Sequence, residues 1–319
     1  MDYILSKYCP RIEFDSYEDF YENFRIDVPE AFNFGFDVVD EWARVEPDKR
    51  ALLWCDDAGE ERTFTFTDIA RLSNKAANAF SKLGVGKGDV VMCILRRRWE
   101  YWVVATALCK LGATVIPASL QLTRKDIAYR ANSAGVKALV CVNDAYVCGE
   151  AEAARADAPS IEHTIVVAGE RDGWANFDAL IAPEPETFDR PVGEAGVTSK
   201  DIMLIYFTSG TTGNPKAVCH NFAHPLGHII TAKYWQQVRE NKLHMSVTDS
   251  GWAKFGWGKI YGQWIAGATI FCYDMDKFVP TKLLQKIQDY RLTTFCAPPT
   301  MYRFMLQEDV SAYDLSSVE

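Results

Sequence analysis

The chain has 319 residues, 48% of them hydrophobic, and a formal net charge of −9 at pH 7. An acidic protein without a basic tract is a poor candidate for binding nucleic acid or an anionic membrane surface. No run in the sequence approaches the roughly 18 consecutive apolar residues that a membrane span requires.

The N-terminal residues show no basic segment followed by an apolar core, so they do not resemble a signal peptide. The chain contains nine cysteines, an odd number, and no C-x-x-C pair. Most of them lie within apolar runs, as Cys93 and Cys141 do, which indicates reduced core cysteines. We therefore expect a soluble, cytoplasmic protein.

Residues 1–35 are rich in Tyr, Phe, Asp and Glu without a clear hydrophobic period, and we predict that they form a surface segment. Apolar residues then recur at helical spacing up to Leu83, with Thr67 as the expected N-cap and Gly84 at the C-terminal end. A buried strand is predicted at 90–95, a helix ended by Gly112, and a second strand at 113–118.

Thr123 and Asp126 form a capping-box pair that opens the next predicted helix. Strands at 136–142 and 163–169 flank a helix predicted at 146–156. Strands and helices thus alternate in short steps, and the strands are continuous apolar runs. This pattern predicts an α/β fold with layered, mostly parallel sheets flanked by helices.

A polar connector at 183–200 divides a first predicted α/β subdomain, 36–182, from a second one at 201–319. The three arginines Arg96, Arg97 and Arg98 end an apolar run. Three charges are too few for a surface that follows a phosphate backbone, so we interpret them as a solvated strand end.

An unusual polar loop, TSGTTGNPK, directly follows an apolar strand at 201–207. Its glycines allow amide groups to approach an anion, its hydroxyl side chains add donors, and Lys216 supplies a compact positive charge. The NTPase motif G-x-x-x-x-G-K-[ST] is excluded, because Ala217 follows the lysine where that motif needs a hydroxyl. A phosphate-binding loop of another kind is favoured over an ordinary polar connection.

The segment YFTSGTTGNPKAV, Tyr206–Val218, resembles the signature loop of the adenylate-forming superfamily, which includes acyl-CoA synthetases, luciferases and adenylation domains. LGATVIPAS at 111–119 resembles a strand of the same superfamily. SVTDSGWAK at 246–254, GQWIAGATIF at 262–271 and TTFCAPPTMYRFM at 293–305 are similar to the medium-chain acyl-CoA synthetase branch in particular. The resemblance covers the chain from about residue 35 onward and is to the N-terminal part of those enzymes.

This resemblance implies an AMP-forming ligase of fatty acid metabolism that activates a small carboxylic acid with ATP and passes the acyl group to coenzyme A. A carboxylate is a poor electrophile, so joining it to AMP gives it a good leaving group. The negative charge of the triphosphate must be neutralised before the acid can attack the α-phosphate. Thr208 and Lys216 would be catalytic. The ATP phosphates, with Mg2+, would contact the whole loop: Thr208, Ser209, Gly210, Thr211, Thr212, Gly213, Asn214, Pro215 and Lys216.

Gln121 would contact coenzyme A, although a polar lead-in to a helix explains this residue equally well. Trp252, Phe255 and Gly256 would line the acyl pocket. No metal ligands are predicted: His220, His224 and His228 stand four residues apart, but no carboxylate accompanies them.

The chain ends at SAYDLSSVE, and the family's ribose-binding residue, hinge and C-terminal lid domain are not found in it. We therefore expect a truncated first domain that is inactive alone. A non-catalytic nucleotide-binding or assembly module of the same fold remains the alternative, and assembly into a homo-oligomer stays open.

Overall fold

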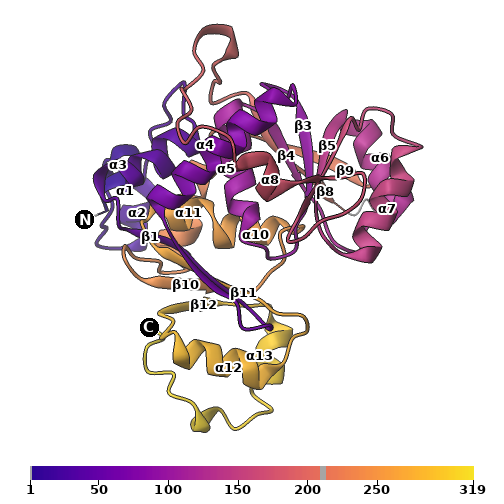
Figure 1. The fold of residues 1–319 in the computed structure, drawn as a ribbon. Helices are drawn as coiled ribbons and strands as arrows, with labels where there is room; N and C mark the ends of the chain where they lie inside the picture. The colour runs from indigo at the N-terminus through magenta and orange to yellow at the C-terminus, as the bar shows by residue number, and fades with distance from the viewer. Residues whose placement is uncertain (1, 209–212) are drawn as a thin grey trace.

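The computed structural model describes residues 2–208 and 213–319. Two sheets form the framework of these residues (Figure 1). The five-stranded sheet has the order β12-β10-β11-β1-β2, with the bounds Thr294–Cys296, Leu243–Ser246, Thr269–Asp274, Arg50–Asp56 and Glu61–Thr65. All neighbouring strands in it are parallel except β1 and β2.

The seven-stranded sheet has the order β7-β6-β5-β3-β4-β8-β9. Its strands are, in that order, Ala175–Asn176, His163–Val167, Val136–Val142, Val90–Ile94, Thr114–Pro117, Ile202–Thr208 and Lys216–Asn221. Only the last pair, β8 with β9, is antiparallel. The predicted α/β class with mostly parallel sheets is confirmed.

Helices cover both sheets. The α-helices are α1 Tyr3–Tyr8, α2 Tyr17–Asn23, α3 Glu41–Val45, α4 Phe66–Lys82, α5 Glu100–Leu111, α6 Arg124–Ala134, α7 Ala145–Arg155, α8 Phe177–Ile181, α9 His224–Ile229, α10 Ala253–Lys259, α11 Tyr261–Ile265, α12 Pro280–Asp289 and α13 Pro299–Met305. Short π-helices lie at Gly35–Asp40 and Ile230–Trp235, and 3-10 turns at Gly193–Ala195 and Val310–Ala312. None of the helices in the described part of the chain has both the length and the apolar character needed to cross a membrane.

The side chains of β3 show how the layers pack. Val91 and Cys93 point into the central core, which also contains α4, α5 and β1, whereas Val90, Met92 and Ile94 point into a second core under α6 and α7. A third core joins the other face of the five-stranded sheet to α12. A strand buried on both faces reads as an unbroken apolar run, because successive side chains point to opposite faces. Figure 1 shows α6 and α7 at the right-hand side of the molecule and α12 at the bottom.

Two predicted boundaries differ from the structure. The connector 183–200 does not separate the two sheets: β8 and β9 follow it but complete the seven-stranded sheet, whereas β1 and β2 precede it but belong to the other sheet. The predicted surface segment 1–35 also contributes fully buried side chains to the central core, among them Ile4, Leu5 and Phe32.

The helix caps agree with the sequence at one site and correct it at another. Thr123 and Asp126 form the predicted capping box of α6, and Gly112 ends α5 with φ of 74°. The predicted N-cap Thr67 is wrong: Thr65 caps α4 in a capping box with Asp68, and the Thr67 hydroxyl donates to the Pro47 carbonyl. All nine cysteines are free thiols, and seven of them are buried.

Candidate functional site

The predicted phosphate loop joins two antiparallel strands. Thr208 ends β8, Lys216 begins β9, and the two residues are paired in register, so the loop forms the tip of a hairpin. Both residues are exposed, and the Thr208 hydroxyl donates to the Lys216 carbonyl oxygen at 3.5 Å. Gly213 has φ of 131°, in a region that favours glycine. Ser209, Gly210, Thr211 and Thr212 lie outside the described residues.

A cavity of about 470 Å3 lies beside this hairpin. Three distant segments line it: Pro117–Ser119 with Leu122, Tyr206–Thr208 with Pro215, and Gly251–Ala253. The first two segments follow or end parallel strands, and ligand sites in open α/β sheets gather at the carboxyl ends of such strands. The cavity therefore joins the phosphate loop to the segments predicted for coenzyme A and for the acid.

Helix α6 supports this cavity with two side chains that the sequence analysis did not single out. The Tyr129 hydroxyl donates to the Pro215 carbonyl oxygen at 3.1 Å, which ties the helix to the loop. Arg130 lines the cavity, and its guanidinium lies 5.4 Å from the centroid of the Phe207 ring. Both residues follow the Thr123 cap by about two turns, so helical periodicity places them on adjoining faces of α6. Arg130 adds a second cation to the site beside Lys216.

The predicted substrate residues separate in the structure. Trp252 lines the cavity with 60% of its surface exposed. Phe255 is fully buried and packs against Tyr101 and Trp102, with ring centroids 4.7 and 5.0 Å away, so it belongs to the core and not to the cavity wall. Phe255 points into the core because it lies on the face of α10 that packs against α5.

Gly256 does not line the cavity, but it contacts Tyr206, which does. A Cβ atom at this position would lie 2.5 Å from the Tyr206 hydroxyl, so glycine lets that tyrosine lie close to α10 while it lines the cavity. Gln121 is exposed and does not line the cavity, although its neighbours Ser119 and Leu122 do; its backbone N–H donates to the Ser119 hydroxyl at 3.3 Å.

The three histidines with four-residue spacing come together behind the hairpin. His220 lies on β9, and its ring centroid is 4.2 Å from that of His224; the Nε2 atoms of His224 and His228 are 3.0 Å apart. Burial lowers the pKa of His224 to about 3 and that of His228 to about 4, and neighbouring imidazoles add to the effect. Within the described residues, no group of three or more His, Cys, Asp or Glu side chains is arranged to hold a metal ion.

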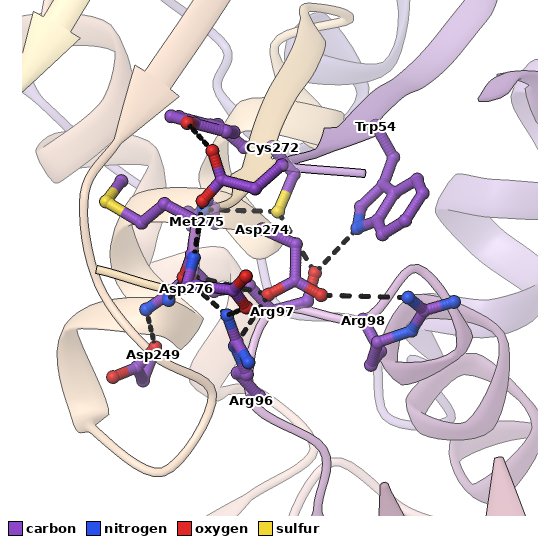
Figure 2. A network of polar contacts seen from close by, with 12 residues as sticks. Trp54, Arg96, Arg97, Arg98, Asp249, Cys272, Asp274, Met275 and Asp276 are labelled. Carbon is purple, nitrogen blue, oxygen red and sulfur yellow. Dashed lines mark hydrogen bonds and ion pairs between the residues drawn. The ribbon is translucent and has the colours of Figure 1, made fainter. Parts of the chain in front are cut away.

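The three arginines after β3 are not a solvated strand end, as the sequence suggested. Only 23%, 12% and 13% of the side-chain surfaces of Arg96, Arg97 and Arg98 are exposed. All three face Asp274 at the end of β11, as Figure 2 shows. The arginines therefore connect the two sheets beneath the cavity-lining loops.

Comparison with known proteins gives consistent matches. A sequence model of the family described as AMP-binding enzyme matches residues 39–319. The chain is 32% identical over 316 residues to the mitochondrial acyl-coenzyme A synthetase ACSM3 of Homo sapiens, covering 96% of this chain and 53% of that protein. It is 35% identical over 295 residues to the mitochondrial acyl-coenzyme A synthetase ACSM5 of Mus musculus, covering 90% of this chain and 50% of that protein.

A solved structure has the same fold. The crystal structure of the anthranilate CoA ligase AuaEII in complex with anthranoyl-AMP superposes with a TM-score of 0.82 at 24% identity, covering 92% of this chain and 55% of that one. The chain spans about half the length of the curated relatives it matches. The expected cytoplasmic location is wrong by this comparison: those relatives are named as mitochondrial proteins, which points to mitochondria instead.

Proposed function

The chain belongs to the AMP-binding enzyme family, and on this premise we propose that it forms the phosphate-binding part of an ATP-dependent acyl-CoA synthetase. The reaction would join a small carboxylic acid to ATP, giving an acyl-AMP and pyrophosphate. The acyl group would then pass to the thiol of coenzyme A. Relatives that are acyl-coenzyme A synthetases by name support this class of reaction.

The hairpin and α6 supply the charge that the first step needs. An acid carboxylate attacks the α-phosphorus while the bond from that phosphorus to the pyrophosphate oxygen breaks, so negative charge grows on the leaving group. Lys216 and Arg130 are the cations placed at or beside the loop, and Thr208 offers a hydroxyl donor. Preorganised donors and cations of this kind stabilise a transition state more than they stabilise the reactants.

The proposed reaction also requires Mg2+ and coenzyme A, and the part of the chain that the structure describes offers a candidate binding segment only for coenzyme A. A bound Mg2+ would neutralise phosphate charge, and we assign it no protein ligand among the described residues. Coenzyme A would approach along Ser119–Leu122, because this segment borders the cavity next to the phosphate hairpin. Gln121 lies at the exposed end of that approach and is a proposed contact for the coenzyme A chain.

One observation carries the proposal: Thr208 and Pro215 of the phosphate hairpin line the same cavity as Trp252 and Ser119. A site for two successive substrates needs such a meeting of separate segments, since the reacting atoms must be brought within about 3–3.5 Å of each other.

Pyrophosphate release from ATP tests this function in the longer enzyme of which the chain is proposed to form part. With a panel of straight-chain, branched and aromatic acids, we expect release that requires both ATP and an acid, and thioester formation that also requires coenzyme A. ATP binding without release for any acid would contradict the proposal and favour the non-catalytic nucleotide-binding module.

A further inference from the structure

The arginine turn after β3 connects the two sheets through one buried carboxylate. Asp274 ends β11, and only 5% of its side-chain surface is exposed. Arg96 Nε lies 2.9 Å from its Oδ1, and Arg97 Nε and Arg98 Nη1 lie 3.8 Å from its carboxylate oxygens. Burial raises the pKa of Asp274, whereas the three guanidinium groups act in the opposite direction.

The backbone of Arg97 is fixed from the five-stranded sheet. Its carbonyl oxygen accepts hydrogen bonds from Trp54 Nε1 at 2.9 Å and from Cys272 Sγ at 3.3 Å. Trp54 belongs to β1 and Cys272 to β11, so two neighbouring strands hold this peptide. A guanidinium on such a rigid base directs its five donors to defined positions.

From this base, Arg97 reaches the loop that carries Trp252. One guanidinium nitrogen pairs with the Asp249 carboxylate and another donates to the Met275 carbonyl oxygen (Figure 2). The backbone N–H of Ser250 donates to the Arg96 carbonyl oxygen at 2.9 Å. Two consecutive loop residues are thus held by two consecutive residues of the arginine turn.

The other side of this loop is closed by the segment after β4. A Cβ atom on Gly251 would lie 2.4 Å from the backbone nitrogen of Ser119, so the two backbones touch. Residues 249–251 therefore contact the arginine turn on one side and Ser119 on the other, and Trp252 is the next residue in the chain. The backbone N–H of Trp252 donates to the Asp249 carbonyl oxygen at 3.1 Å, which makes the tryptophan part of the same turn.

Trp252 forms part of the wall of two cavities. One is the cavity beside the phosphate hairpin; the other, of about 600 Å3, has an apolar wall that includes Val247, Met275, Phe278 and Met301. Arg97 and Asp249 also line this second cavity. Trp252 is therefore shared by the walls of the two cavities.

We propose that Arg97 is a positioning residue that, through Asp249, holds Trp252 as the partition between the two cavities and so determines which acids fit. The selection of acids rests on the proposed function, whereas the placement of Trp252 does not. Loosening the ion pair frees the tryptophan, joins the two spaces and widens the range of accepted acids.

Fluorine NMR of protein labelled with 5-fluorotryptophan tests the placement, with Trp252→Phe identifying the resonance. In Asp249→Asn we expect this resonance to narrow and to move toward the position of free 5-fluorotryptophan, and Arg97→Lys should produce a smaller shift in the same direction. Asp276→Asn is the matched control, because Asp276 pairs with Arg96 at 2.8 Å and not with Arg97. An unchanged Trp252 resonance in Asp249→Asn, with the fold intact by circular dichroism, would overturn the proposal.

Steady-state kinetics with acids of increasing length test the selection. We expect Asp249→Asn to reduce the ratio of kcat/KM between the preferred acid and longer ones by roughly tenfold. The change should fall mainly on the KM for the acid, with the KM for ATP unaltered. A shifted resonance with unaltered selectivity would overturn the role in acid selection. If no acid supports pyrophosphate release in the longer enzyme without substitutions, the proposed function fails, and the NMR result still decides the positioning role.

Discussion

The phosphate hairpin and the arginine turn are both rich in groups that bind anions, but the fold uses them differently. At the hairpin, Lys216 is exposed, and its contact with Thr208 is made by its backbone carbonyl oxygen. At the turn, Arg97 is largely buried, and its two terminal guanidinium nitrogens pair with Asp249 and Met275. Cationic residues in a sequence therefore do not by themselves identify a ligand site. The structure is needed to show which of them are paired with groups inside the protein.

The largest effect should come from the exposed cation. Lys216→Ala should slow acid-dependent pyrophosphate release roughly 100- to 1000-fold, the usual loss when one preorganised donor is removed from a transition state. Thermal unfolding should be unchanged, because the side chain is exposed. Lys200→Ala is the matched control: it removes an exposed lysine before the other end of β8 and should leave the rate unaltered. An equal loss in both variants would contradict the assignment.

The buried network should respond in stability. Asp274→Ala leaves three guanidinium groups without their shared carboxylate, so the free energy of unfolding should fall by about 3 kcal/mol in urea titrations. Asp276→Ala removes a carboxylate that is 75% exposed and should cost less than about 1 kcal/mol. Similar losses for the two variants would mean that burial does not distinguish these ion pairs.

The contact between the cavity-lining loops gives a smaller effect. In Gly251→Ala the new methyl group would collide with the backbone at Ser119, which should lower the free energy of unfolding by about 1–3 kcal/mol. Gly227→Ala tests the same change within α9, where no atom lies within 4 Å of the added carbon. There the free energy of unfolding should rise by about 0.5–1 kcal/mol, because alanine favours the helix. Differential scanning calorimetry of both variants measures the contrast.

The histidines behind the hairpin and Asp274 at the arginine turn should change the free energy of unfolding with pH in opposite directions. The pKa values of His224 and His228 are lowered from 6.5 to about 3 and about 4, so their contribution is present above pH 6.5 and is lost as the pH falls. As the pH falls from 6.5 toward 4, protonation of each histidine in the unfolded chain should lower the free energy of unfolding by at most about 1.4 kcal/mol per pH unit. The double variant His224→Gln/His228→Gln should show a flatter profile in this window; an equally steep profile would contradict the histidine pKa values.

Asp274 should act in the opposite direction. Burial raises its pKa above the ordinary 3.8, so its contribution is complete below that value and is lost as the pH rises through the raised pKa. The histidine variant should therefore change the acid side of the profile in one sense and Asp274→Asn in the other, as measured by chemical unfolding at a series of pH values.

Much of the local structure could be predicted because its causes lie within a few residues. The Thr123 and Asp126 capping box depends on a spacing of three residues, and Gly112 on the freedom of glycine to adopt a positive φ. The prediction failed at Thr67, because Thr65, the last residue of strand β2, is the N-cap of α4, which begins at Phe66. The resemblance assigned Phe255 to the acyl pocket, but this side chain is fully buried in the core. Its distance from Trp252 in the sequence does not show which face of α10 is buried.

The sequence by itself determined the α/β class, the alternation of buried strands and amphipathic helices, and a loop whose residue types suit phosphate. These features depend on local conformational preferences and on the two hydrophobic periods. Only the tertiary structure decided that β8 and β9 join the seven-stranded sheet, that Arg97 pairs with Asp249, and that Trp252 lines two cavities. The pairing of β4 with β8, at Val115 and Leu204, joins residues 89 positions apart, and the pair of Arg97 with Asp249 joins residues 152 positions apart. Local sequence patterns do not show which distant partners the packing of two sheets brings together.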